Sequence, residues 1–338
     1  SLSLSLSLSL SLSLARSPSL SSFYWMADDE GDNGAVHLRV ASYNVHFFES
    51  WTALGRREHG RHVPALLRVM ADAQPDVLCV QEASFASDRH SYARRLFAPD
   101  EDVDEEDMAD KPTVEQLGEL TGLPHCVFRA TGECGPNYGN ALFSRWPLAA
   151  HGAQRLPAPP GHAPRNAVWA LVSVPGAAAP VLVVTCHLDV QSEACRLEQA
   201  AALCELLAEL QHAHEPAGVV LGGDLNAVYL PDLTLEERMR NDAQRRSAGL
   251  KPAADLVLRH LYEQGLDDAF AAATDDSHAR PTAWGRIATC PYGTRIDHLL
   301  TRGLRALAYE RVASDEASDH HCIAAVFAVP SDSQAAST

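Results

Sequence analysis

The chain has 338 residues, with 27 Lys or Arg against 44 Asp or Glu, so its formal net charge is −17 at pH 7. Hydrophobic residues make up 46% and charged residues 21%, which excludes a collagen, a wholly disordered chain and a small disulfide scaffold. No uninterrupted apolar stretch approaches the roughly 20 residues of a membrane-spanning helix, so we expect no stable membrane insertion. The acidic balance also disfavours a general nucleic-acid-binding protein, which needs basic surface to meet phosphates.

The first 36 residues are low in sequence complexity. Residues 1–14 are seven Ser-Leu repeats, a pattern that specifies no packing partner, so we expect disorder over residues 1–36. Ser at every second position makes the repeat a poor secretion signal. A translated nucleotide repeat or a truncated start, with Met26 as initiator, is the favoured interpretation. Arg16 and the serines up to Ser22 leave organelle targeting open as a weaker alternative.

Strands and helices are predicted in mixed order. Alternating or continuous apolar residues predict strands, and apolar residues three and four apart predict helices. In chain order these are a strand at 37–45, a helix at 61–73, strands at 77–81, 140–144, 168–174 and 181–188, a helix at 192–210, a strand at 219–221, helices at 231–248 and 253–264, and strands at 296–300 and 322–329. The pattern favours a layered α/β sandwich with sheets inside and helices outside. We expect one domain over residues 37–330 and a disordered tail at 331–338.

One segment of this domain is strongly acidic. Residues 100–110 read DEDVDEEDMAD, in which eight of eleven positions are acidic. Because like charges repel and few of these residues are apolar, we expect an inserted loop at 99–111 and no packed element. A solvated loop is the favoured interpretation, and a regulatory or partner-binding segment is the alternative.

The eight cysteines form no CxxC pair, and several sit inside apolar stretches. This usage is typical of reduced, buried thiols. It predicts an intracellular protein, cytoplasmic or nuclear, because those compartments keep thiols reduced.

Polar side chains recur where predicted strands end or begin. The sets are Tyr43-Asn44, Gln81-Glu82, Thr185 to Asp189, Gly223 to Asn226, Arg295 to His298 and Ser318 to His321. They supply carboxylates, carboxamides and imidazoles, with no cysteine in a ligand pattern. Oxygen-rich donor sets suit Mg²⁺ or Mn²⁺ better than structural zinc. Carboxylates for such a metal, with His for proton transfer, indicate hydrolysis of a phosphate ester.

The wording and order of these blocks are similar to those of a known superfamily. They read SYNVH, PDVLCVQE, YGNALFSRWPL, TCHLD, GGDLNA, TRIDHLL and SDHH. From about residue 38 to residue 329, the chain resembles the endonuclease/exonuclease/phosphatase superfamily, which has the pancreatic-deoxyribonuclease-like fold. The resemblance implies a four-layer α/β sandwich with two central mixed β-sheets flanked by helices. It also implies an active site at one edge of the two sheets.

The resemblance implies a metal site and a catalytic group. Glu82 would be the principal ligand of Mg²⁺ or Mn²⁺, with Asn44 beside it and Asp319 facing the same ion. A cation would compensate the cost of a carboxylate at a buried strand end. The residues implied in catalysis are Asp224 and Asn226, which would orient the attacking water, His320 as general acid/base with Asp297 fixing its tautomer, and His187, which would donate to a phosphate oxygen.

Three further positions are implied to meet the substrate phosphate. Tyr138, counted with the catalytic residues, and Asn140 match phosphate-contacting positions of the family, and Arg165 matches a recurring basic position. Packing against the sheet edge is the alternative for Tyr138 and Arg165. Asp189 is a secondary candidate for the site.

The expected activity is therefore divalent-metal-dependent hydrolysis of phosphate esters, by a monomeric phosphodiesterase or nuclease that uses in-line attack of water. The alternative is a phosphatase or phosphodiesterase on a small molecule or lipid head group, of the inositol phosphate or sphingomyelin type. A catalytically silent binding module is the third possibility, disfavoured because every site residue is present. Loops at 48–61, 85–131 and 229–265 are expected to select the substrate. The first carries Trp51 among basic residues, which could hold nucleic acid or simply be solvated.

Overall fold

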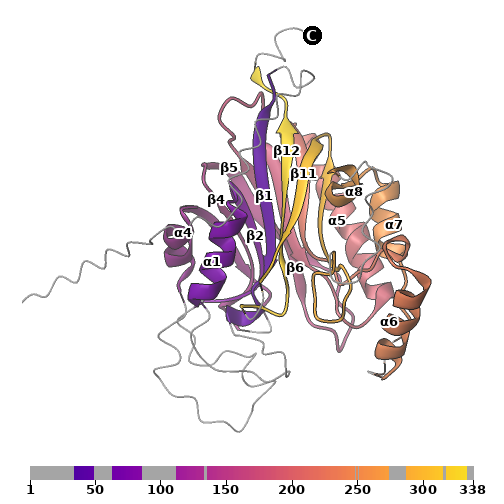
Figure 1. The fold of residues 1–338 in the computed structure, drawn as a ribbon. Helices are drawn as coiled ribbons and strands as arrows, with labels where there is room; N and C mark the ends of the chain where they lie inside the picture. The colour runs from indigo at the N-terminus through magenta and orange to yellow at the C-terminus, as the bar shows by residue number, and fades with distance from the viewer. Residues whose placement is uncertain are drawn as a thin grey trace, which may run out of the picture. The chain divides into compact units, whose positions relative to one another are not determined.

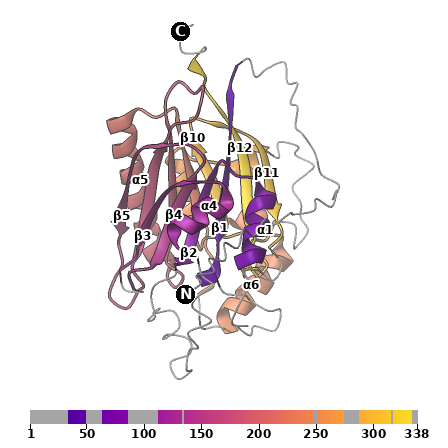
Figure 2. The same cartoon turned by 90° about the vertical axis from the view of Figure 1, so that its left-hand side faces the viewer.

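Two six-stranded sheets form the centre of the molecule in the computed structural model, which describes residues 34–48, 63–85, 112–132, 135–247, 249, 251–273, 287–314 and 317–332. The predicted acidic loop at 99–111 lies outside the described residues, as do residues 1–33, the loop segment 49–61 and residues 333–338. Figures 1 and 2 show the two sheets from perpendicular directions.

The first sheet, sheet A, is built mainly from the N-terminal part of the chain and is completed by its last two strands. Its order is β11 (Arg305–Val312), β12 (Cys322–Val329), β1 (Val36–Asn44), β2 (Val77–Ser84), β4 (Tyr138–Ser144) and β3 (His125–Ala130). Strands β1 and β2 are parallel, and the other neighbours are antiparallel. The parallel pair places the C-terminal ends of β1 and β2 at the same sheet edge.

The second sheet, sheet B, is also mixed. Its order is β5 (Leu148–Leu156), β6 (Arg165–Val172), β7 (Val181–His187), β8 (Gly218–Asp224), β10 (Asp297–Arg302) and β9 (Asp267–Asp268). Here β7 and β8 are parallel, and the other pairs are antiparallel. Each sheet therefore has one central parallel pair whose C-terminal ends carry polar residues.

Helices cover the outer face of each sheet. They are α1 (Val63–Ala73) and α4 (Val114–Thr121) on sheet A, and α5 (Glu193–His214) and α7 (Leu256–Glu263) on sheet B, followed by α8 (Ala269–Ala273). The connection after β8 contains the short 3₁₀ helix η2 (Leu230–Asp232) and α6 (Leu235–Ser247), and a second 3₁₀ turn, η1 (His46–Phe48), follows β1. No helix among the described residues is both long and apolar enough to cross a membrane.

Alternation along the strands creates the layers. On β1, Leu38 and Val40 belong to the core between the sheets, in one cluster with Val220 of β8, while Ala41 and Tyr43 belong to the core beneath α1. Successive strand side chains point to opposite faces, so one strand serves two cores. The result is helix, sheet, sheet, helix, which confirms the predicted four-layer sandwich with two mixed sheets (Figure 2).

The sequence-based prediction missed mainly the outermost strands. Strands β3, β5 and β11 lie at or beside sheet edges, and β5 (LAAHGAQRL) alternates between half-buried and exposed positions with few β-branched residues. The expected loop at 85–131 contains α4 and β3. Helix α4 begins with a reciprocal pair of hydrogen bonds between Thr113 and Gln116 and ends at Gly122 in the left-handed conformation. The capping residues at its two ends therefore define this helix, although its apolar periodicity is short.

Candidate active site

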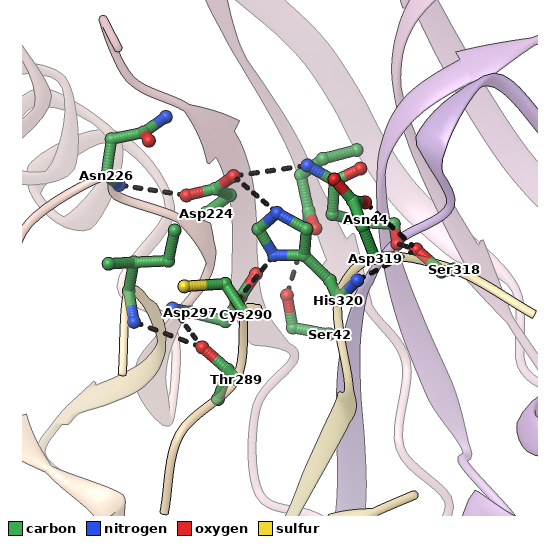
Figure 3. Close-up of polar contacts among 12 residues, drawn as sticks. Ser42, Asn44, Asp224, Asn226, Thr289, Cys290, Asp297, Ser318, Asp319 and His320 are labelled. Carbon is green, nitrogen blue, oxygen red and sulfur yellow. Dashed lines mark hydrogen bonds and ion pairs between the residues drawn. The ribbon is translucent and has the colours of Figure 1, made fainter. Parts of the chain in front are cut away.

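Strand ends from both sheets meet at one edge and bring the polar residues together. Asn44 ends β1, His187 ends β7 and Asp224 ends β8, while Asp297 begins the antiparallel strand β10. In the ladder of sheet B, Asp224 stands opposite both His187 and Asp297. Figure 3 shows the result: Asn44 from sheet A lies beside Asp224 from sheet B, and Asp297 lies on the other side of the His320 ring. Residues far apart in sequence thus share one buried cluster.

Asn44 connects the two sheets at this edge. Its Nδ2 donates to Oε1 of Glu82 over 3.2 Å and to Oδ2 of Asp224 over 3.1 Å. Its Oδ1 accepts from the backbone N–H of His46 over 3.0 Å. Asn44 is 1% exposed, so both carboxylates are held by an amide that water does not reach.

Glu82 sits at a break in its strand. The register of β2 against β4 shifts between Val80 and Ala83, and Glu82 has φ 53°. A bulge re-aims one side chain, and a non-glycine residue in this region is strained. Burial raises the pKa of Glu82, and the neighbouring Asp319 carboxylate raises it further, against the lowering effect of His46 and Asn44. The bulge in β2 therefore places the Glu82 carboxylate where the Asp319 carboxylate makes its charged form less favourable.

His320 and Asp297 form a short contact within the cluster. The imidazole Nδ1 of His320 donates to Oδ2 of Asp297 over 2.8 Å, while its Nε2 lies 3.7 Å from Oδ2 of Asp224. Burial alone would lower the pKa of His320, but Asp297 and Asp224 raise it well above its ordinary value. Burial raises the pKa of Asp297 to about 6, against the lowering effect of His320. The imidazole therefore lies between two buried carboxylates, which favour its protonated form (Figure 3).

A serine holds the backbone of this histidine. Ser318 Oγ donates to the carbonyl of Asn44 over 2.8 Å and accepts from the backbone N–H of His320 over 3.1 Å. The segment that carries Asp319 and His320 is thereby fixed to the end of β1.

Asp224 and Asn226 form a compact turn against His187. The backbone N–H of Asn226 donates to Oδ1 of Asp224 over 2.9 Å, and Asn226 has φ 47°, a conformation that asparagine tolerates. Its Nδ2 donates to the carbonyl of Leu188 and lies 3.0 Å from Nε2 of His187. Burial and the nearby Arg165 charge lower the pKa of His187 to about 3, so this ring is neutral. Its Nε2 also lies 3.4 Å from Oδ2 of Asp224, and its Nδ1 lies 3.6 Å from Oε1 of Glu82.

Arg165 lies beside His187 and is 6% exposed. Within the described part of the chain its guanidinium forms no hydrogen bond or ion pair, and its Nε is buried without an acceptor. A buried charge without a partner is costly. The arrangement is suited to an anion that approaches the cluster.

The other two predicted phosphate contacts have protein partners in the structure. Tyr138 stacks on Phe47, with ring centroids 5.0 Å apart. Asn140 donates to the side chain of Asn166 over 2.8 Å and to its carbonyl over 3.1 Å, which ties β4 of sheet A to β6 of sheet B. Both residues are buried, Tyr138 at the start of β4 and Asn140 two residues later.

Asp189 belongs to a neighbouring group. Its Oδ1 accepts two backbone N–H bonds at the start of α5, and its Oδ2 lies 2.8 Å from Nδ1 of His162. Cys195 lies near enough for the three side chains to offer one ligand atom each. Both oxygens of Asp189 are already engaged, and Arg196 lies against its carbonyl, so this group anchors the loop before β6 to α5. The seven described cysteines are free thiols.

Two supporting residues were not predicted from the sequence. Gln81 donates from its buried amide to Ser42 and Thr185, and Thr289 accepts from the backbone of Ile296 and Asp297. Gln81 belongs to the block PDVLCVQE, so the residue itself stands out in the sequence. The sequence does not predict its hydrogen-bond partners. Thr289 lies in a stretch without regular structure and carried no signal.

The donor set fits a divalent cation of the Mg²⁺ class. Glu82 and Asp319 offer carboxylate oxygens, and the charge of Asp319 makes the charged form of Glu82 more costly, as the raised pKa of Glu82 shows. A cation held by both carboxylates would remove that cost, whereas the amide of Asn44 presents its nitrogen to Glu82 and its oxygen to the N–H of His46. Ligand atoms of Asp224, Asp297 and His320 also lie within 4.8 Å of one another.

Comparison with known proteins places this arrangement in a family. Residues 41–320 match the model of the Endonuclease/Exonuclease/phosphatase family. The catalytic domain of human Nocturnin, with bound sulfate anion, is 17% identical with a TM-score of 0.56, covering 87% of this chain and 96% of that one. A mannosyl-6-phosphatase from Bacteroides thetaiotaomicron is 16% identical, with TM-score 0.55 and coverage of 85% and 98%. Truncated TDP2 from Caenorhabditis elegans is 17% identical, with TM-score 0.54 and coverage of 87% and 98%.

The similarity to solved structures shows the fold, and the match to the family model shows which family the chain belongs to. Comparison with curated protein sequences gives no match. The matched residues, 41–320, contain Asn44, Glu82 and every other residue of the cluster up to His320. The chain therefore belongs to the endonuclease/exonuclease/phosphatase family.

Proposed function

We propose that the chain is a divalent-metal-dependent hydrolase of phosphate esters, acting as a phosphodiesterase or nuclease through in-line attack of water. The observation that carries the proposal is the contiguous buried cluster in which Asp224 contacts Asn44, His187 and His320, with Asp297 behind His320. Hydrolysis of a phosphate ester needs an oriented water, a proton carrier and compensation of anionic charge. The cluster contains a candidate for each of these tasks. We place the catalytic domain at residues 37–330.

The metal would be Mg²⁺ or Mn²⁺, held by Glu82, Asp319 and Asn44. When bound, such an ion supplies Lewis-acid polarisation of the phosphate and neutralises carboxylate charge. The high cost of charge on Glu82 beside Asp319 supports this assignment.

Asp224, Asn226 and His320 would manage the attacking water. The Asp224 carboxylate can accept a proton from the water in a hydrogen bond, and its Oδ2 already lies 3.7 Å from Nε2 of His320. His320 would give or take the proton at Nε2, because its Nδ1 is committed to Asp297. Asp297 thereby fixes the tautomer and supports the charged imidazolium.

His187 and Arg165 would meet the phosphate oxygens. His187 is neutral, so it can donate one hydrogen bond without adding charge of its own. Arg165 supplies a fixed positive charge beside it that has no partner in the described protein. Tyr138 and Asn140 remain proposed phosphate contacts on the strength of the sequence resemblance alone.

A small substrate is the second candidate. The net charge of −17 opposes tight, salt-driven binding to long nucleic acid. This charge favours a phosphatase or phosphodiesterase acting on a small molecule or lipid head group over an enzyme that grips an extended duplex.

One panel of substrates tests both candidates. The purified chain is assayed with Mg²⁺ and with Mn²⁺ on single-stranded and duplex DNA, RNA, cyclic dinucleotides, inositol phosphates and sphingomyelin. We expect turnover of at least one phosphate ester, loss of that turnover in EDTA and its recovery on adding excess Mg²⁺ or Mn²⁺. Full activity in excess chelator would refute the metal role, and no turnover across the panel would refute the proposal.

A further inference from the structure

Thr289 lies behind the His320–Asp297 pair and contacts the backbone on both sides of it. The residue is fully buried, in the stretch that leads from residue 287 into β10. Its backbone N–H donates to the carbonyl of Thr294 over 3.0 Å, which closes a small loop over residues 289–294. Thr289 is therefore held in place independently of its side chain.

The hydroxyl oxygen of Thr289 holds the start of β10. It accepts from the backbone N–H of Ile296 over 3.0 Å and from that of Asp297 over 3.1 Å (Figure 3). Two consecutive N–H groups, that of Ile296 partly buried and that of Asp297 buried, thus share one side-chain acceptor. Without it, the buried N–H of Asp297 would have no partner, and an unpaired buried donor is costly.

The backbone carbonyl of Thr289 holds the other partner. It accepts from the N–H of His321 over 2.8 Å, one residue beyond His320. Asp297 begins a strand of sheet B, whereas His320 and His321 immediately precede β12 of sheet A. Strands β10 and β12 are not neighbours in a ladder, so no ladder fixes the distance between Asp297 and His320. Thr289 supplies a hydrogen-bonded connection between their backbones.

We infer that Thr289 is a positioning residue for the His320–Asp297 pair, a role that rests on the proposed function of that pair. The hydroxyl of Thr289 fixes the backbone of Asp297, and its carbonyl fixes the segment that carries His320. Together they allow the 2.8 Å contact between Nδ1 of His320 and Oδ2 of Asp297. Thr289 itself touches no substrate. Its effect is on the orientation of the imidazole that carries the proton.

Two substitutions at Thr289 separate the effect of its hydroxyl group from the effect of its side-chain shape. Thr289→Val keeps the shape and removes the acceptor, whereas Thr289→Ser keeps the acceptor. A misplacement of about 1 Å can cost roughly a hundredfold in rate, so we expect Thr289→Val to lower kcat by about 10- to 100-fold with little change in KM. Thr289→Ser should stay within about threefold of the original kcat, since the oxygen that orients the pair is retained.

Thr301→Val is the matched control. Thr301 is buried near the other end of β10, and its hydroxyl donates to the carbonyl of Val219 within sheet B. Its loss should lower stability without lowering kcat. If Thr289→Val does not fold, Thr289→Ala, which leaves room for water at the two N–H groups, replaces it in the comparison.

A proton NMR measurement gives a readout besides activity. The Nδ1 proton of His320, shared with Asp297, should give a far-downfield resonance that Thr289→Val shifts or broadens and that Thr289→Ser and Thr301→Val preserve. An unchanged resonance together with an unchanged kcat in Thr289→Val would overturn the inference, and so would an equal loss in Thr289→Ser. An inactive original chain would refute the proposed function, while the resonance would still decide the role of Thr289.

Discussion

The buried amide of Gln81 joins the two sheets directly beneath the candidate site. Its Nε2 donates to Oγ1 of Thr185 on sheet B over 2.9 Å and to Oγ of Ser42 on sheet A over 3.1 Å. Gln81 precedes Glu82, and Thr185 lies two residues before His187 on the same strand face. Apolar packing between sheets is non-directional, so this contact fixes their lateral alignment where the site requires it.

A double-mutant cycle tests this connection. Gln81→Leu and Thr185→Val should each lower the free energy of unfolding by about 1–3 kcal/mol, because each leaves a buried polar group unpaired. The double variant should lose less than the sum, with a coupling of about 0.5–3 kcal/mol measured by urea denaturation. Strict additivity would show that the two side chains do not stabilise each other.

The buried Arg295 should be essential for stability. Its guanidinium contacts Asp232 at 2.7 Å and Asp268 at 2.6 Å, and it is 2% exposed. Arg295→Met leaves two carboxylates without their cation and should cost about 3–5 kcal/mol in urea denaturation. The exposed ion pair of Arg240 with Glu236 provides the control, since Arg240→Met should cost less than about 1 kcal/mol. Equal losses for the two variants would contradict the prediction.

His298 should make the protein less stable in acid. Burial and the Arg295 charge lower its pKa from 6.5 to about 4, and its Nε2 donates to the carbonyl of Ala227 over 2.9 Å. A lowered histidine pKa means that the unfolded chain binds the proton more readily. The stabilisation is therefore full above pH 6.5 and is lost as the pH falls from 6.5 towards 4.

The size of the effect is about 3 kcal/mol across that interval. His298→Gln can retain the donor to Ala227 but cannot be protonated, so its unfolding free energy should fall less steeply between pH 6.5 and 4. The exposed His151→Asn serves as control and should leave the slope unchanged. Identical slopes for the original chain and His298→Gln would exclude this origin of acid sensitivity.

Adjacent histidines offer a direct test of the proton carrier. His320 contacts Asp297, whereas Nδ1 of its neighbour His321 accepts from the backbone N–H of Ser314 over 3.0 Å. His320→Asn should reduce turnover by at least about 100-fold with the fold intact, since general acid–base catalysis contributes about 10²–10⁴-fold. His321→Asn retains an acceptor for Ser314 and should remain within about threefold. Activity of His320→Asn within tenfold of the original chain would refute the assignment.

Removing Arg165 should affect anion binding more than folding. Because its buried guanidinium has no partner among the described residues, Arg165→Met should leave the ligand-free stability unchanged or raised. The rise in Tm that inorganic phosphate produces should disappear, because ligand stabilisation follows affinity. The exposed Arg155→Met provides the control. A destabilised variant that still responds fully to phosphate would show that Arg165 has a structural role instead.

The sequence by itself determined the fold class and the identity of the clustered residues. Apolar alternation predicted the central strands, and polar residues at strand ends, such as Asn44 and Asp224, marked where the strands finish. These signals are local in the sequence. A strand that is buried on both faces is a continuous apolar stretch, and the polar residues at its end interrupt that stretch. The outermost strands β5 and β11 escaped prediction because a half-exposed edge weakens that pattern.

Only the tertiary structure decided which polar groups become partners. Asn140 contacts Asn166, Asp189 contacts His162, and Thr289 holds both sides of the His320–Asp297 pair. Except for that of Thr289 with Asp297, these contacts join segments that are distant in sequence, so no spacing rule within a motif predicts them. The physical reason is that hydrogen bonds depend on distance and angle across the two sheets, whereas the sequence pattern specifies only which face of a strand is buried.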